Sequence, residues 1–578
     1  MRRTKIICTI GPASESPEKI QQLLDAGMNV ARLNLSHGNQ EEHLKRIRVL
    51  REVSARMETN LGILLDTKGP EIRTGLVPDD GVMLKNGSQF ILDTDKQTGS
   101  ATRVYISYEN LWREVHPGTR ILVDDGLMEL EVTAVQEGKI ITKVINGGIL
   151  KSRKGVNVPG VAVQLPALTT KDVEDIRFGI NNDIDFIAAS FTRKAADILE
   201  VRKLIEEAGS DVKIIAKIES REGIDNIDGI LSVADGVMIA RGDLGVEIPV
   251  EDVPVCQKEI IAKCNELGKI VIVATQMLDS MIRQPRPTRA EASDVANAIL
   301  DGADAIMLSG ETAAGSFPVE AVQTMDRIAR KTESIFFKNN ESAVIPANKG
   351  RDIADAIGHA CKTIATDLNA AAIITPTQSG TTARLISRYR PKSLIIAATP
   401  YPAVARKLSL NWGVNTILVE ESSGTDELLS MAVSKAVDKH VLKTGDLVVL
   451  TAGVPVGKVG TTNLIKVQVV GNILTRGTGI NKKSYSGTAR HKKSGLFNRG
   501  DILVTEATEA EDLSLIAKAG ALVVERGGIT SHAAILAIEY GIPAIVGAPD
   551  AVQKIEEGSI ITVVPSSGVV YEGYVSMI

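Results

Sequence analysis

The stretch Asp235–Ile248, DGVMIARGDLGVEI, changes character in its middle. Residues 237–240 are small or apolar, which predicts a strand that is buried on both faces. The next five residues, Arg241-Gly242-Asp243-Leu244-Gly245, place two opposite charges on either side of one glycine and before another. A turn at the end of a strand needs glycine but neither charge, so Arg241 and Asp243 indicate a function at this strand end.

The same pattern recurs along the first 335 residues. A short β-branched run ends in polar or glycine residues, and an amphipathic segment follows. The run ends are CTIGPAS, ARLNLSHG, LLDTKGP, IAASFT, IIAKIES, VMIARGDLG, VIVATQM and AIMLSGET. Eight strand–helix units predict a parallel (β/α)8 barrel with its helices outside.

The rest of the chain predicts further α/β and β domains. The barrel is expected at 1–70 and 168–345, where Thr169 or Thr170 caps the helix on its return. Residues 71–167 hold short strands and turns, which predicts an inserted all-β domain. An open α/β domain is expected at 346–475. A small terminal module is expected at 501–578.

Residues 476–500 have a different composition from the modules on either side. They hold five glycines and seven Lys or Arg without an acidic residue. This composition predicts a solvated linker, with a basic anchor for a partner as the alternative.

Composition excludes several classes of function. Aromatic residues make up 3 % of the 578 residues and the formal net charge is −5, so a nucleic-acid partner is not expected. No apolar run is long enough to span a membrane. The N-terminus MRRTKIICTIG predicts a first strand and no secretion signal. Four scattered cysteines fit a reducing, cytoplasmic compartment.

The polar strand ends of a barrel meet at one face, where such barrels place their active sites. Glu219 and Asp243 end neighbouring strands and can face one gap. Two carboxylates with few other ligands suit Mg²⁺, which keeps waters and takes substrate oxygens. The alternative is that Asp243 pairs with Arg241 and caps the next helix.

Lys217 lies two residues before Glu219, so strand alternation places both side chains on the same inward side. A buried ammonium beside a metal and carboxylates can stabilise a transferring phosphoryl group or an enolate. The alternative role is a Schiff-base nucleophile. The neighbouring magnesium site favours the electrostatic role.

Further polar residues follow the second and third strands. Four of them supply hard oxygen atoms with one formal negative charge: Asn34, Ser36, Asp66 and Thr67. Such a set suits a monovalent cation, and the alternative is ordinary hydrogen bonding within the loops. Arg32 and Arg73 carry guanidinium groups suited to phosphate.

Long motifs in the chain resemble pyruvate kinase. They are ARLNLSHG, LLDTKGPEIRTG, SRKGVNVPG, IIAKIESREGI, MIARGDLGVEI and ATQMLDSMI with the PRPTRAEASDVANAILDGADAIMLSGETA that follows it. The resemblance covers residues 1 to about 472 and implies phosphoryl transfer from phosphoenolpyruvate to ADP, giving pyruvate and ATP as the last step of glycolysis.

The resemblance also implies roles for particular residues. Lys217, Arg32 and Thr275 are expected to be catalytic, and Lys217 stabilises the transition state and the enolate. Mg²⁺ is expected at Glu219 and Asp243, and K⁺ at Asn34, Ser36, Asp66 and Thr67. Substrate contacts are expected from Arg32, Lys217, Gly242, Asp243 and Thr275, and nucleotide contacts from Asn34, His37, Arg73 and Lys154. Lys154 lies on the inserted domain, which closes over the site as a lid in the family. Glu71 matches the K⁺-dependent members.

The α/β domain carries TPTQSGTTARLISRYRP, which resembles the effector loop of the family. Hydroxyl groups around a glycine at a helix start suit a phosphorylated small-molecule effector, with a plain helix cap as the alternative; the residues are Thr377, Ser379, Gly380, Thr381 and Thr382. The family is usually tetrameric, so a homotetramer is expected.

The terminal module contains ERGGITSHAAILAIEYGIPAIVG, which resembles the swivelling phosphohistidine domain of phosphoenolpyruvate-utilising enzymes such as pyruvate phosphate dikinase. His532 falls at the position of their phosphocarrier. Those enzymes also carry a nucleotide-grasp domain, which this chain lacks. We therefore expect a structural or regulatory module rather than a working carrier.

Two rival functions remain open at this point. A magnesium-dependent barrel lyase or aldolase acting on a pyruvate enolate would also suit KIES, but it would need neither ADP nor a lid bearing Lys154. A non-enzymatic sensor would predict a degraded barrel site, whereas every site position here is filled.

Overall fold

The computed structural model describes residues 1–78, 80–339, 353–422, 424–453 and 462–575. Two compact units are present within it. The first contains the described residues before the gap at 340–352 together with Ser379–Arg390 and Tyr401–Thr416, and the second contains the rest. None of the helices within the described ranges has the length and hydrophobicity needed to span a membrane.

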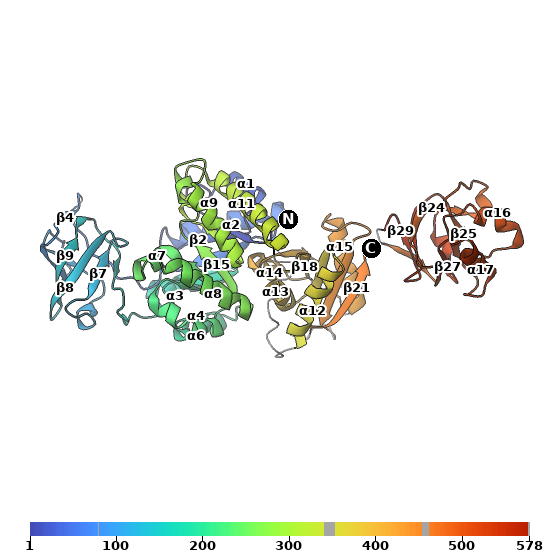
Figure 1. Cartoon of the computed structure of the whole chain (residues 1–578). Helices are drawn as coiled ribbons and strands as arrows, with labels where there is room; N and C mark the ends of the chain where they lie inside the picture. Colours follow the sequence, from blue (N-terminus) through green and yellow to red (C-terminus); the bar gives the residue numbers. More distant parts are fainter. Residues whose placement is uncertain (79, 340–352, 423, 454–461, 576–578) are drawn as a thin grey trace. The chain divides into compact units, whose positions relative to one another are not determined.

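A closed barrel of eight parallel strands forms the centre of the first unit (Figure 1). Its order around the barrel is β1-β16-β15-β14-β13-β12-β3-β2. The strands are β1 Lys5–Thr9, β2 Val30–Asn34, β3 Gly62–Asp66, β12 Phe186–Ala189, β13 Lys213–Ile218, β14 Gly236–Ala240, β15 Ile270–Ala274 and β16 Ala305–Leu308. Nearly every residue of these strands is buried, because helices cover their outer face. The predicted (β/α)8 barrel is confirmed.

Helices follow the barrel strands as the sequence predicts. They are α1 Pro17–Ala26, α2 Gln40–Arg56, α3 Thr170–Asn181, α4 Ala195–Glu207, α5 Arg221–Asp225, α6 Ile227–Val233, α7 Arg241–Glu247, α8 Val253–Leu267, α9 Arg289–Asp301, α10 Gly310–Ala313 and α11 Pro318–Asn339. Thr169 and Asp172 form a capping box at the start of α3, which confirms a threonine cap where the chain returns to the barrel.

The insertion after β3 has its own sheet and its own hydrophobic core. A six-stranded sheet runs in the order β11-β7-β8-β9-β5-β6, and β10 pairs with β4. The strands are β4 Val82–Leu84, β5 Gln89–Asp93, β6 Arg103–Tyr105, β7 Arg120–Val123, β8 Met128–Gln136, β9 Lys139–Asn146, β10 Gly148–Leu150 and β11 Val156–Asn157, with the short helix η1 Leu111–Arg113. Phe90, Leu92 and Leu130 are among its buried residues. We call this domain the lid.

The α/β region contains a five-stranded sheet in the order β19-β18-β17-β20-β21. Its elements are α12 Ile353–Asp367, β17 Ala372–Pro376, α13 Thr381–Arg388, β18 Leu394–Thr399, α14 Pro402–Lys407, β19 Val414–Leu418, α15 Thr425–Asp438, β20 Leu447–Gly453 and β21 Thr462–Val469. Helices α13 and α14 fall within the compact unit of the barrel.

The last part of the chain forms an eight-stranded sheet in the order β22-β29-β28-β24-β25-β26-β27-β23. The strands are β22 Ile473–Arg476, β23 Thr478–Ile480, β24 Tyr485–His491, β25 Ile502–Thr505, β26 Ala521–Val524, β27 Ala544–Val546, β28 Ile560–Val564 and β29 Val569–Glu572. Helices α16 Leu513–Ile516, α17 His532–Glu539 and α18 Ala551–Lys554 lie between them in the chain.

The prediction of a solvated linker at 476–500 is wrong, because this segment supplies β23 and β24 to the sheet. Its glycines permit close packing: a Cβ on Gly479 would lie 1.8 Å from the Pro565 carbonyl oxygen. Some of its charges are paired, since Lys492 lies 2.9 Å from Asp512 and Arg490 lies 3.1 Å from Glu557. The terminal sheet therefore begins at β22 and not at residue 501.

Candidate active site

Lys217 lies at the centre of a buried polar network at the carboxyl ends of the barrel strands. Its ammonium donates to the Glu219 carboxylate at 2.8 Å and to the Ser190 hydroxyl at 2.8 Å, and lies 3.2 Å from Asp66. Burial disfavours the ammonium, but the charges of Asp66 and Glu219 outweigh it and raise the pKa of Lys217 above its ordinary value. The site therefore holds a charged lysine.

Arg32 extends the same network toward the first barrel strand. Its guanidinium donates from Nε to Asp66 at 2.7 Å and from Nη1 to the Thr9 hydroxyl at 2.9 Å. Asp66 on β3 thus contacts two cationic side chains, Arg32 from the neighbouring strand β2 and Lys217 from β13. This brings together the predicted residues Arg32, Asp66, Lys217 and Glu219.

Glu219 and Asp243 form a pair of neighbouring carboxylates, and the nearby Lys217 does not neutralise both of them. Burial, and then the charge of Glu219, raise the pKa of Asp243 from 3.8 to about 7. A divalent cation shared by the two carboxylates would remove this repulsion, so the residues fit a hard metal ion with oxygen ligands. The described residues contain no cluster of three or more His, Cys, Asp or Glu that would make an alternative metal site.

Arg241 does not pair with Asp243, so that alternative is wrong. It donates to Asp294 at 2.7 Å and to the Thr275 carbonyl at 2.8 Å. Helix α7 is preceded by Ala240, and no side chain caps it. Asp243 therefore lies in the first turn of α7 with its carboxylate available to the site.

Thr275 has a strained backbone that Arg241 helps to hold. Its φ angle is 68°, and that of Gln276 is 55°. A β-branched residue rarely adopts positive φ, and such strain is typical of functional sites. The N–H of Gly242 donates to the Thr275 hydroxyl at 2.8 Å. The predicted substrate residues Gly242 and Thr275 are therefore in direct contact.

The residues expected to bind a monovalent cation lie at the ends of β2 and β3. Asn34 and Asp66 are neighbours in the register of these strands. Asn34 accepts the N–H of Ser36 at 3.1 Å, and Thr67 accepts the N–H of Ser190 at 3.2 Å. These are the loop hydrogen bonds of the alternative interpretation, and they leave further oxygen lone pairs for a cation. His37 is exposed on the loop after β2.

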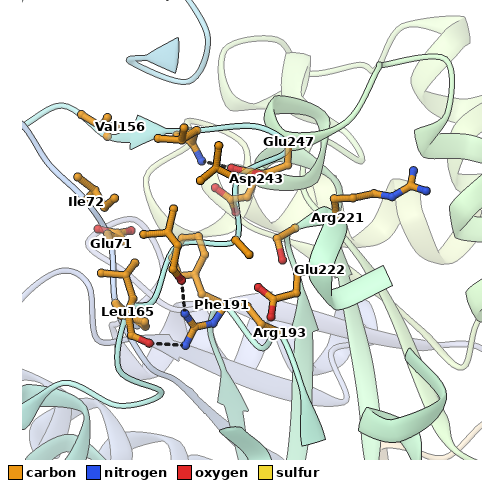
Figure 2. Close-up of a pocket in the computed structure, with 18 of the residues that line it drawn as sticks. Glu71, Ile72, Val156, Leu165, Phe191, Arg193, Arg221, Glu222, Asp243 and Glu247 are labelled. Carbon is orange, nitrogen blue, oxygen red and sulfur yellow. Dashed lines mark hydrogen bonds between the residues drawn. The ribbon is translucent and has the colours of Figure 1, made fainter. Parts of the chain in front are cut away.

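The predicted nucleotide residues Arg73 and Lys154 line one pocket with Asp243, and its volume is about 510 Å³. Figure 2 shows Glu71 and Ile72 across this pocket from Asp243 and Glu222. Arg73 donates to Glu71 at 2.5 Å, and Lys154 lies 2.8 Å from Asp124. Asn34, His37, Lys217 and Thr275 are not among its lining residues.

Ser190 and Phe191 belong to the site but were not predicted. Ser190 contacts Lys217, and the N–H of Phe191 donates to Glu219 at 2.5 Å. Phe191 has a φ angle of 54°. Both follow β12, in the strand end IAASFT. The position of this strand end among the eight could have identified them, although neither residue is charged.

The predicted effector residues lie at the start of α13. Gly380 precedes the helix with a φ angle of 80°, and no side chain caps it. The hydroxyls of Ser379 and Thr381 are 2.9 Å apart, and Arg384 donates to Thr381 at 3.1 Å. Thr382 lies in the first turn of α13. Thr377 belongs to the other compact unit, where its N–H donates to Ala398 at 2.8 Å.

His532 is the first residue of α17. Ser531 caps this helix by accepting the N–H of Ala534. His532 is exposed, and its Nδ1 lies 3.2 Å from the Thr508 hydroxyl.

Comparison with known proteins agrees with this architecture. Residues 1–322 match the family model for the pyruvate kinase barrel domain, and residues 355–468 match the pyruvate kinase alpha/beta domain. Residues 497–568 match the mobile domain of PEP-utilising enzymes.

Curated relatives are similar over their full length. The chain is 53 % identical to pyruvate kinases from Bacillus licheniformis and Geobacillus stearothermophilus, with 100 % of this chain and of each relative covered. It is 48 % identical to pyruvate kinase from Staphylococcus aureus strain USA300, again with 100 % of both covered. With its barrel, its α/β domain and its full length all matched, the chain belongs to the pyruvate kinase family.

Proposed function

We propose that the barrel site transfers the phosphoryl group of phosphoenolpyruvate to ADP, giving pyruvate and ATP, with the residues described above in specific roles. The observation that carries the proposal is the buried ammonium of Lys217 between two carboxylates at the barrel mouth. Membership of the pyruvate kinase family supports the reaction, the substrates and the need for divalent and monovalent cations.

The roles of the residues follow from charge. Phosphoenolpyruvate and ADP are both anions, so the site must concentrate positive charge, and catalysis is mainly positioning and electrostatics. Arg32, Lys217, Gly242, Asp243 and Thr275 bind phosphoenolpyruvate, and Asn34, His37, Arg73 and Lys154 bind the nucleotide. Lys217 donates its N–H groups to the oxygens on which negative charge develops, and it neutralises the enolate of the product.

Two cations complete the charge balance. Glu219 and Asp243 would hold Mg²⁺, which supplies charge neutralisation to the phosphoryl and carboxylate oxygens. Asn34, Ser36, Asp66 and Thr67 would hold K⁺ by their oxygen atoms. The raised pKa of Asp243 supports the Mg²⁺ assignment. The neighbouring positions of Asn34 and Asp66 at the ends of β2 and β3 support the K⁺ assignment.

The rival functions fit less well. A Schiff-base nucleophile needs a neutral amine, whereas the raised pKa of Lys217 keeps it charged. A lyase or aldolase needs no nucleotide pocket, whereas Arg73 and Lys154 line a pocket that also contains Asp243. A sensor without activity would not need the cationic network around Asp66.

The dependence on a monovalent cation can be tested at Glu71. With a bulky organic cation replacing K⁺ at constant ionic strength, we expect the parent enzyme to lose most of its activity. Glu71→Lys should make the residual activity independent of K⁺, because its ammonium replaces the missing charge. The measurement is the rate of pyruvate formation across a K⁺ titration. Full parent activity without any alkali cation would refute the assignment.

Family membership also supports proposals for the rest of the chain. We propose that Ser379, Gly380, Thr381 and Thr382 bind a phosphorylated small-molecule effector, and that the protein is a cytoplasmic homotetramer. The terminal module is assigned a structural or regulatory role, because the kinase residues all precede it.

Removal of the terminal module tests this role. The stop must precede β22, because β22 pairs with β29 in the module sheet. A chain that ends at Gly471 is expected to keep kcat within about threefold, since the terminal module has hydrophobic clusters of its own, apart from those of the barrel and the α/β domain. Its melting temperature should fall, because Val469 packs against Val569 and Tyr571. Near-complete loss of turnover in a folded truncated chain would show that the module takes part in catalysis.

We also expect that His532 carries no phosphoryl group. Incubation with phosphoenolpyruvate labelled in its phosphate is expected to leave no acid-labile label on the chain. The matched control is His532→Ala. Label present in the parent and lost in this variant would assign a carrier role to the module.

A further inference from the structure

Two chain crossings join the lid to the barrel, and Asp172 holds both of them. Its carboxylate accepts the N–H of Gly69 on the outgoing crossing at 2.9 Å. It also accepts the N–H of Thr169 on the returning crossing at 2.9 Å, and the Thr169 hydroxyl at 2.6 Å. Asp172 is fully buried at the start of α3. The barrel ends of both crossings are therefore fixed at one carboxylate.

Arg193 holds the returning crossing just before it reaches α3. Its guanidinium donates to the carbonyl of Leu165 at 2.8 Å (Figure 2). It also donates to the carbonyl of Val163 at 3.0 Å and of Pro166 at 3.3 Å. Its own N–H donates to Asp197 in the first turn of α4 at 2.9 Å. The backbone of Arg193 is therefore held by the barrel, and its side chain binds three carbonyl groups of the returning segment.

The lid holds the same segment at the residue in between. Gln164 donates its N–H to the Glu114 carboxylate at 3.3 Å. Tyr108 donates to Glu114 at 2.7 Å, and its hydroxyl lies 3.2 Å from the Gln164 carbonyl. Successive residues are therefore held from opposite sides, by Arg193 of the barrel and by Tyr108 and Glu114 of the lid. This segment is therefore one contact between the lid and the barrel, and a second is the hydrogen bond from Asn157 of the lid to Glu247 of α7 at 2.9 Å.

The nucleotide residues lie on a part of the lid that is joined to these crossings. Thr74 donates its N–H to the Lys154 carbonyl at 2.8 Å, and Arg73 donates to the Arg153 carbonyl at 2.9 Å. Arg73 and Lys154 thus move together with the start and the end of the lid. Arg193 also follows Phe191, whose N–H holds Glu219, by only two residues. One short loop contacts both the proposed metal ligand and the lid.

We propose that Arg193 is a positioning residue for phosphoryl transfer. By holding residues 163–166, it positions the cationic side chains of Arg73 and Lys154 relative to Glu219 and Asp243. The inference rests on the proposed function of Arg73 and Lys154. Arginine is required because its planar fork serves several acceptors at once, whereas a lysine ammonium is a single point of charge. Arg193 lines the same pocket as Arg73 and Lys154, and its guanidinium donates to the carbonyl groups of the returning segment.

The experiment compares Arg193→Gln and Arg193→Lys with the parent enzyme. The matched control is Arg120→Gln, which removes an exposed lid arginine that pairs with Glu129. Both Arg193 variants are expected to raise the KM for ADP and to lower kcat, each by about tenfold, because small misplacements of positioning groups are costly. Binding of phosphoenolpyruvate, measured by calorimetry with Mg²⁺ and K⁺, should change by less than about twofold, since its contacts lie on the barrel.

Hydrogen exchange provides a second readout that does not depend on activity. In the ligand-free chain, amide exchange at 158–168 is expected to accelerate in both Arg193 variants and to stay unchanged in Arg120→Gln. Unchanged exchange and an unchanged KM for ADP would overturn the proposal. Equal losses of ADP and phosphoenolpyruvate affinity would also overturn it, because they indicate general damage to the site. Absence of phosphoryl transfer in the parent chain would instead overturn the proposed function. The exchange data would still report whether Arg193 holds residues 163–166.

Discussion

Replacement of Lys217 by methionine is expected to lower kcat by at least about 10³-fold, the size of effect that follows loss of a preorganised charge. The ammonium of Lys217 has a fixed position, because Ser190 and Glu219 each accept from it at 2.8 Å. No water or mobile side chain can replace a charge held in this way without reorganisation. Steady-state kinetics of pyruvate formation is the measurement.

The matched control for this variant lies on the same strand. Lys213→Met removes an ammonium from the opposite end of β13, where Lys213 lies 3.8 Å from Asp235. It is expected to leave kcat nearly unchanged. Phosphoenolpyruvate binding to Lys217→Met should persist, as Arg32, Gly242 and Thr275 remain. Turnover of Lys217→Met within tenfold of the parent would refute the assignment.

Replacement of Asp243 by asparagine is expected to lower the affinity for Mn²⁺, used as a probe of the divalent site, by roughly 10²-fold at pH 8, with a comparable loss of kcat. In the parent the affinity should rise with pH between 6 and 8, because a proton competes with the metal at a group whose pKa is about 7. The variant cannot bind this proton, so its affinity should be nearly independent of pH. Electron paramagnetic resonance of free Mn²⁺ provides the measurement.

The stability of the metal-free chain should follow the same titration with a defined sign. Folding raises the pKa of Asp243 from 3.8 to about 7, so its protonated form contributes stability that is complete below 3.8. That contribution is lost as the pH rises through about 7, and Asp243→Asn should abolish the loss. Asp228→Asn, at an exposed residue of α6, is the control. For the metal-binding prediction, a parent affinity for Mn²⁺ that does not change from pH 6 to 8 would contradict the assignment of Asp243 as a metal ligand.

The barrel and the centre of its site could be predicted from the sequence for a physical reason. Parallel strands buried on both faces are continuously apolar, so the polar residue that ends each strand is conspicuous. Alternation along one strand placed Lys217 and Glu219 on the same side, and their side chains are 2.8 Å apart. The alternation of side chains along a single strand was enough to predict this contact.

Other features depend on contacts that a local pattern does not encode. The role of Phe191 lies in a backbone N–H, which every non-proline residue possesses. Arg241 pairs with Asp294, which is 53 residues away, instead of with its neighbour Asp243. Residues 476–500 were expected as a linker because glycine marks both flexible chain and close backbone packing. At Gly479 the reason for glycine is close backbone packing, because the Pro565 carbonyl leaves no room for a Cβ.

A coupled assay that follows pyruvate and ATP together separates phosphoryl transfer from the rival functions. With phosphoenolpyruvate as substrate, we expect pyruvate and ATP to form in equal amounts. Both products should require ADP, Mg²⁺ and K⁺ together, so that omission of any one of them removes most of the rate. Pyruvate released at an undiminished rate without ADP, or without matching ATP, would contradict phosphoryl transfer and would favour a lyase or a hydrolase.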